Sequence, residues 1–118
     1  MDDLKQFYTL VGADAAEVVA RLCGDSALVK KFLMKFKTDR SFSELCDALD
    51  NNDTETAFRA AHTLKGICAN LGIRCLFEQA SVVTELLRNG DIKKAKESLP
   101  TVIREYNRVD EALKNLKD

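Results

Sequence analysis

The chain has 118 residues, which suffices for one domain with one hydrophobic core. It carries 18 Lys and Arg and 19 Asp and Glu, a formal net charge of −1, which argues against bulk electrostatic attraction to nucleic acid or an anionic membrane. The sequence contains one histidine, so a zinc site that needs two imidazoles within the chain is excluded.

Glycines divide the sequence into segments with helical periodicity. Glycine is favoured just past the end of a helix, because it adopts the left-handed conformation without a Cβ clash. Four glycines lie between the periodic segments: Gly12, Gly24, Gly72 and Gly90. The first two predict short helices at about 3–10 and about 14–22.

The next two segments precede the central part of the chain. Ser26 is positioned to cap a helix with apolar residues at helical spacing, namely Leu28, Val29, Phe32, Leu33 and Phe36. Ser41 then begins a second apolar pattern, either as a new helix or after a break at Thr38–Arg40. The helix boundaries between Thr38 and Ser41 therefore stay open.

Three longer helices follow. Asp53 or Thr54 caps a helix that ends at Gly72, and a second apolar stripe continues to Gly90. The last segment repeats apolar residues in steps of three and four, at Leu99, Val102, Tyr106, Val109, Leu113 and Leu116. Pro100 is expected to kink this helix or to begin a new one. We predict an all-α single domain over 1–118: an antiparallel four-helix bundle at about 26–117, with short additional N-terminal helices at about 3–22.

The cysteines and the start of the chain indicate a compartment. The four cysteines, at positions 23, 46, 68 and 75, form no Cys-x-x-Cys pair. The sequence begins without the pattern of a signal peptide, and no apolar run is long enough for a membrane span. We therefore expect reduced, buried thiols in a cytoplasmic protein.

His62 is the candidate for chemistry. On a helical wheel it lies roughly 130° from the centre of the apolar stripe, so its ring is expected to reach solvent. Phe58, Lys65, Gly66 and Ala69 are its neighbours on the same face, because residues three, four and seven positions apart share a helix face. A neutral, exposed imidazole is a nucleophile near neutral pH.

Gly66 and Lys65 suggest what that nucleophile accepts. A glycine in mid-helix costs about 1 kcal/mol relative to alanine, and here it would let another surface approach the imidazole. The Lys65 ammonium can lie near an anion on the ring, so the group suits a phosphoryl acceptor. Two plainer interpretations stay open: solvated surface for the His and Lys, and close packing of a neighbouring helix for the Gly.

At these residues the sequence resembles the histidine-containing phosphotransfer (HPt) family of two-component phosphorelays. The resemblance is carried by Ala61-His62-Thr63-Leu64-Lys65-Gly66, followed by Asn70-Leu71-Gly72, and extends over about residues 26–117. It implies a four-helix bundle in which His62 accepts the phosphoryl group, Lys65 stabilises it and Gly66 keeps the approach open. The protein would then be a phosphotransfer intermediate and not an autonomous kinase.

The resemblance also implies partners. Receiver domains of response regulators and hybrid sensor kinases would dock over His62 and supply Mg²⁺, while the chain, expected to be a monomer, would need no cofactor or metal of its own. We expect a mostly apolar docking patch of Phe58 and Ala69, with Val83 and Thr84 from the following helix as weaker candidates.

Two alternatives remain. The chain could be a non-catalytic helical adaptor that binds receiver or kinase domains through the same patch. It could also be the phospho-accepting domain of a chemotaxis-type kinase, which takes its phosphate directly from an ATP-bound catalytic domain.

Overall fold

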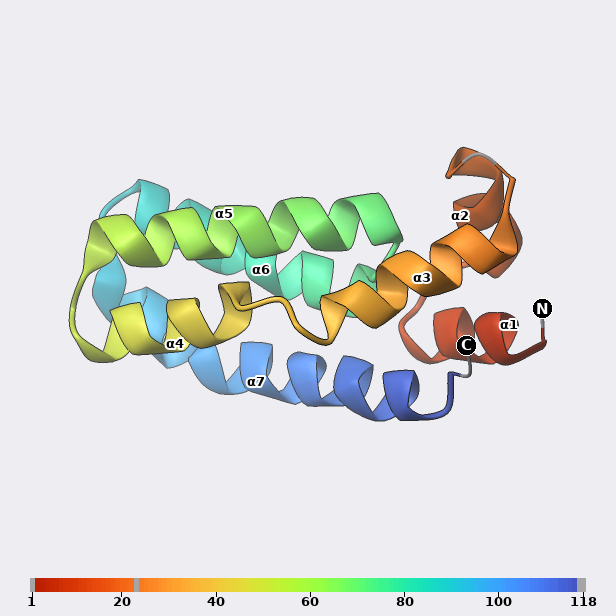
Figure 1. Cartoon of the computed structure of the whole chain (residues 1–118). Helices are drawn as coiled ribbons and strands as arrows, with labels where there is room; N and C mark the ends of the chain where they lie inside the picture. Colours follow the sequence, from red (N-terminus) through yellow and green to blue (C-terminus); the bar gives the residue numbers. More distant parts are fainter. Residues whose placement is uncertain (1, 23, 117–118) are drawn as a thin grey trace.

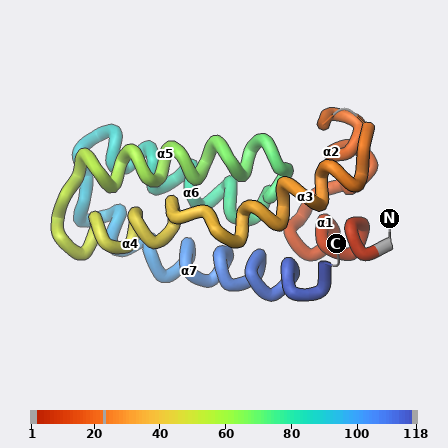
Figure 2. The backbone as a smooth tube through the Cα atoms, viewed as in Figure 1, coloured from red at the N-terminus to blue at the C-terminus, as the bar shows by residue number. Residues whose placement is uncertain are grey.

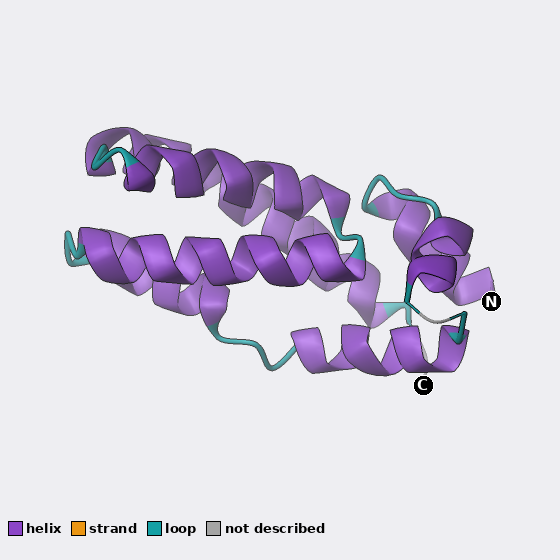
Figure 3. Cartoon of the chain, turned by 90° about the horizontal axis from the view of Figure 1, so that it is seen from above, coloured by secondary structure: helices purple, strands orange, loops and turns teal. Residues whose placement is uncertain are grey.

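The computed structural model describes residues 2–22 and 24–116, and Figure 1 shows its helices. Within these residues there are helices and loops but no strand (Figure 3), which confirms the all-α prediction. The helices are α1 (Asp2–Leu10), α2 (Ala15–Arg21), α3 (Ser26–Phe36), α4 (Ser41–Asp50), α5 (Thr54–Leu71), α6 (Arg74–Arg88) and α7 (Ile92–Lys114). Among the described residues, none of these helices combines the length and apolar character needed to cross a membrane.

Helices α4 to α7 form the predicted antiparallel four-helix bundle. Short turns reverse the chain between them, and α5 packs against both α4 and α6, while α7 packs against α6 and α4 (Figures 1 and 2). Helix α3 extends the α4 side of the bundle, and α1 and α2 lie at the end where α5 turns into α6. The result is an elongated molecule of 42 × 23 × 20 Å.

Aspartates begin four of the helices. The side chains of Asp14, Asp25, Asp53 and Asp91 each accept a hydrogen bond from a backbone N–H in the first turn. The cap of α3 is therefore Asp25, one residue before the predicted Ser26, which is the first residue of the helix. Of the two candidates for α5, Asp53 is the cap.

The structure determines the two helix boundaries that the sequence leaves open, one between Thr38 and Ser41 and one at Pro100. A loop separates α3 from α4, and the Asp39 carboxylate accepts a 2.8 Å hydrogen bond from the Ser41 N–H, so a new helix begins at Ser41. Helix α7 continues through Pro100, so of the two predicted alternatives, a kink or a new helix, the new helix is wrong. A helical proline leaves the carbonyl four residues earlier without its usual donor, and that residue, Lys96, is exposed, where water can satisfy the carbonyl.

The N-terminal helices are bonded to the bundle at the α5–α6 turn. The buried Tyr8 hydroxyl donates a 2.6 Å hydrogen bond to the Leu71 carbonyl, and the Cys75 N–H donates to the Val11 carbonyl. Burial raises the pKa of Tyr8 well above its ordinary value, so the hydroxyl stays protonated as a donor. These bonds fix the end of the helix that carries His62.

Among the described cysteines, Cys68 and Cys75 are buried and Cys46 is partly buried, and all three are free thiols. Burial raises the pKa of each thiol, which disfavours the reactive thiolate. The prediction of burial is thus confirmed for Cys68 and Cys75 and only in part for Cys46, whereas Cys23 lies outside the described residues.

Candidate functional site

Helix α5 presents His62 to solvent. The helix buries one stripe of side chains against α4 and α6, namely Ala57, Ala60, Ala61, Leu64, Cys68 and Leu71. His62 lies off this stripe and is exposed, as the helical wheel predicts. The small alanines in the stripe let α5 pack closely while leaving its outer face free for other contacts.

Gly66 places no side chain on that outer face. It is exposed, and a Cβ built on its backbone meets no heavy atom within 4 Å. The glycine is therefore not required by close packing of a neighbouring helix, which removes the plainer of its two explanations. Lys65, beside it, is half-buried, so its stem lies along the helix surface while its position remains one turn from His62.

Phe58 supports the imidazole from the preceding turn. The rings of Phe58 and His62 are stacked, with centroids 5.9 Å apart and planes inclined by 14°. The Arg88 guanidinium, from the end of α6, lies over the Phe58 ring at 5.1 Å from its centroid. Arg88 Nε in turn donates to both carboxylate oxygens of Glu85 at 3.2 Å.

The predicted docking residues fall into two groups. Phe58 is half-buried and Ala69 is exposed, both on α5. Val83 and Thr84 have no exposed surface, so neither lies where a partner could touch it, and this part of the docking prediction is wrong. Val83 belongs to the buried side chains of α6 and points into the core. Thr84 is also buried, and its hydroxyl donates a hydrogen bond to the Ala80 carbonyl, which satisfies the hydroxyl inside the bundle.

Sequence reasoning missed Arg88. A signal for it exists, because α5 and α6 form an antiparallel hairpin about Ile73, and Phe58 and Arg88 stand at equal distances along the chain from that residue. The exposed apolar side chain on α6 is Val82, 48% exposed, and it precedes the buried Val83. A one-residue error in assigning the helix face thus explains the choice of Val83.

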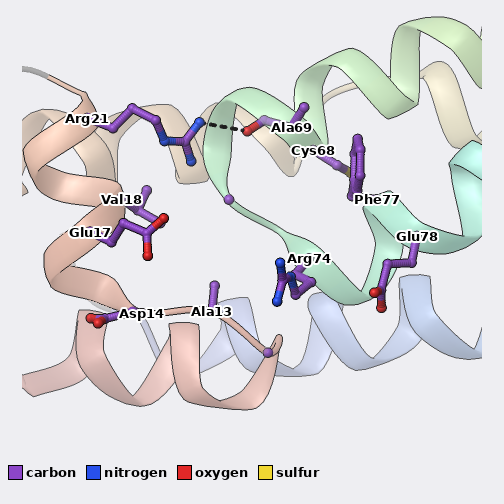
Figure 4. Close-up of a pocket in the computed structure, with 12 residues that line it drawn as sticks. Ala13, Asp14, Glu17, Val18, Arg21, Cys68, Ala69, Arg74, Phe77 and Glu78 are labelled. Atoms are coloured by element: carbon purple, nitrogen blue, oxygen red, sulfur yellow. Dashed lines mark hydrogen bonds between the residues drawn. The ribbon is translucent and has the colours of Figure 1, made fainter.

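A cavity of about 520 Å³ lies beyond Ala69, between α2 and the α5–α6 turn. Figure 4 shows the Arg21 guanidinium donating to the Ala69 carbonyl at 3.1 Å, with Glu17 on the same helix and Arg74 and Glu78 on α6. Charges of both signs line the cavity, and it includes neither His62 nor Gly66. It therefore adjoins the candidate site without containing its nucleophile.

The described residues hold no group of three or more His, Cys, Asp and Glu side chains placed to bind a metal ion. The site offers an exposed imidazole on the outer face of α5, with Lys65 one turn away and open space at the position of a Gly66 side chain. Such an arrangement suits transfer of an anionic group delivered by a second macromolecule.

Fold and site together define a class: a helical bundle that exposes its one histidine on the outer face of a bundle helix. A family model described as Hpt domain matches residues 28–118, and the chain belongs to this family. The family carries out histidine phosphotransfer in phosphorelays, where its members interact with receiver domains. Neither the curated proteins nor the solved structures contain a significant match to the chain.

Proposed function

We propose that the chain shuttles a phosphoryl group between aspartates of receiver domains through phosphohistidine at His62. One observation carries the proposal: His62 is exposed on α5, one turn before a glycine whose surroundings are open. A catalytically silent adaptor would have no need for a nucleophile there, nor for a mid-helix glycine that weakens the helix.

The proposed transfer is a direct displacement at phosphorus. A neutral ring nitrogen of His62 attacks the aspartyl phosphate in line, so that a nitrogen–phosphorus bond forms while the oxygen–phosphorus bond breaks. The bonding electrons of the broken bond leave with the aspartate carboxylate. The reverse reaction, on a second receiver domain, regenerates the imidazole.

The neighbours of His62 have separate roles in this mechanism. The Lys65 ammonium offsets the negative charge that arrives with the phosphoryl group, and the bare backbone at Gly66 lets the receiver surface approach. Mg²⁺ bound by the receiver domain would supply further charge stabilisation, and we assign no cofactor to the chain itself. Phe58 and Ala69 would contribute the apolar contact.

A relay assay with purified components tests the proposal. One receiver domain, phosphorylated in advance with a small phosphodonor and freed of it, is mixed with the chain and with a second, unphosphorylated receiver. We expect the phosphoryl group to pass through the chain to the second receiver. When His62 is replaced by Gln, the phosphoryl group should remain on the first receiver.

Other outcomes would identify the alternatives. Binding of both receivers without any label on the chain would indicate an adaptor. Labelling by an isolated kinase catalytic domain with ATP, and by no receiver tested, would indicate the chemotaxis-type phospho-accepting domain. Either outcome would overturn the shuttle.

A further inference from the structure

Three side chains from two helices are stacked in series at the candidate site. The guanidinium of Arg88 lies over Phe58, and Phe58 is stacked on His62. The series begins on the last turn of α6 and ends at the nucleophile on α5, so it crosses from one helix of the hairpin to the other.

Each contact restricts the next side chain. Glu85 holds the guanidinium from the same helix through two hydrogen bonds to Arg88 Nε. A cation over an aromatic face is attracted by the ring quadrupole, which favours the one orientation of the Phe58 ring that lies beneath Arg88. The Phe58 ring is nearly parallel to the His62 imidazole and restricts its rotation. The two rings remain stacked only over a narrow range of His62 side-chain torsions.

The Arg88 end of the series lies outside the hydrophobic core. The Arg88 side chain is 51% exposed and that of Glu85 is 55% exposed, and Phe58 is only half-buried at the edge of the core. Phe58 packs against the core from outside the buried stripe of α5. The contacts are therefore placed where they act on the orientation of an exposed side chain.

We propose that Arg88 is a positioning residue for phosphotransfer, which orients the His62 imidazole through the Phe58 ring. The proposal rests on the proposed function, since it assigns a role in the reaction of that site. Pre-orienting the nucleophile lowers the entropy lost on reaching the geometry of in-line attack, so it acts on the rate within the complex and leaves the affinity for the receiver unchanged.

The test combines kinetics with nuclear magnetic resonance. Transfer from a phosphorylated receiver domain is measured over a range of receiver concentrations for wild type, Arg88→Gln, Phe58→Leu and the double variant. Arg104→Gln, which removes the same charge from an exposed position on α7, is the matched control. Because the chain has one histidine, its imidazole resonances are assigned without ambiguity in every variant.

We expect Arg88→Gln to lower the rate at saturating receiver by about two- to fivefold, the size of an exposed cation–π contact, with the half-saturating concentration unchanged. Arg88→Lys, which keeps a cation, should restore part of the rate. In the Phe58→Leu background, Arg88→Gln should have no further effect, because the aromatic ring that connects Arg88 to His62 is already absent.

The imidazole resonances should move toward those of a free histidine in Arg88→Gln and in Phe58→Leu, and stay in place in Arg104→Gln. Unchanged resonances in Arg88→Gln, a change confined to the half-saturating concentration, or a full further loss in the double variant would each overturn the proposal. If wild type accepted no phosphate at all, the proposed function would fail, while the resonance comparison would still decide whether Arg88 orients His62.

Discussion

At the scale of single residues, the site is defined by where α5 places small side chains. Alanines on the buried stripe let the helix pack closely, and the absent side chain of Gly66 leaves the outer face open next to His62. The sequence alone predicts both the exposure of His62 and the unusual position of Gly66. It could not distinguish an open glycine from one packed against a helix, because that depends on where other elements lie.

Replacing Lys65 by Ala should slow phosphotransfer by about three- to tenfold, since a partly exposed ion pair contributes on the order of 1 kcal/mol. The bundle should stay folded, because Lys65 lies off the buried stripe. Transfer rates from a phosphorylated receiver, together with circular dichroism, measure the two effects. Lys93→Ala, at an exposed position on α7, is the control, and equal rates in both variants would contradict the role of Lys65.

Two substitutions at Gly66 should have opposite consequences. Gly66→Ala should raise the free energy of unfolding by about 1 kcal/mol, because alanine has the higher helix propensity and its Cβ meets nothing. Gly66→Leu should also fold but should block the approach of a receiver and so abolish transfer. Urea unfolding and the transfer assay measure the two, and normal transfer in Gly66→Leu would show that the open approach is irrelevant.

At the scale of elements, the sequence predicts the helices through their caps and apolar stripes. The gap between α3 and α4 was foreseen because the apolar pattern stops at Phe36 and resumes at Phe42. The sequence leaves open whether α7 continues through Pro100, because local rules describe the cost of the proline while packing of the buried face of α7 offsets that cost. Val83 and Val82 differ by one helical position, and only the packed hairpin shows which one is buried.

The cap of α5 gives the stability of the site helix a pH dependence. Hydrogen bonds from the side chain and then the backbone of Thr56 lower the pKa of Asp53 below its ordinary 3.8. The carboxylate therefore contributes stability above the pKa of the unfolded state, and this contribution is lost as the pH falls through the lowered pKa of the folded state.

Asp53→Asn should keep an acceptor at the cap but remove this titration. The difference in unfolding free energy between wild type and Asp53→Asn should therefore shrink between about pH 6 and about pH 3, as measured by urea unfolding. Asp53→Ala, which removes the acceptor as well, should be the least stable of the three at neutral pH. A difference that is constant with pH would show that the charge of Asp53 does not act at the cap.

At the scale of the whole molecule, two short helices are joined to one end of the bundle. Val18 of α2 lies so close to Gly72 that a Cβ on the glycine would come within 2.5 Å of its Cγ2. Helices α1 and α2 were predicted from their glycine stops, but their docking against the α5–α6 turn could not be, because it depends on contacts distant in sequence, such as Tyr8 with Leu71.

A pair of glycine substitutions isolates that docking. Gly72 and Gly90 both have left-handed backbones, with φ of +70° and +74°. Of the two, only a Cβ added at Gly72 would collide with a neighbouring side chain, that of Val18. Gly90→Ala should lose about 1 kcal/mol of unfolding free energy through backbone strain alone. Gly72→Ala should lose at least about 1 kcal/mol more, because the buried Val18 must move. Equal losses in denaturant unfolding would contradict the close packing of α2.

The central claim is that His62 carries the phosphoryl group, and one labelling experiment tests it most directly. The chain is incubated with a receiver domain bearing radioactive phosphate, and the label on the chain is then exposed to acid and to alkali. We predict a label on wild type that acid removes and alkali does not, and no label on a folded His62→Gln variant, since the sequence offers no other imidazole. An unlabelled wild type, or a label that survives in His62→Gln, would contradict the account.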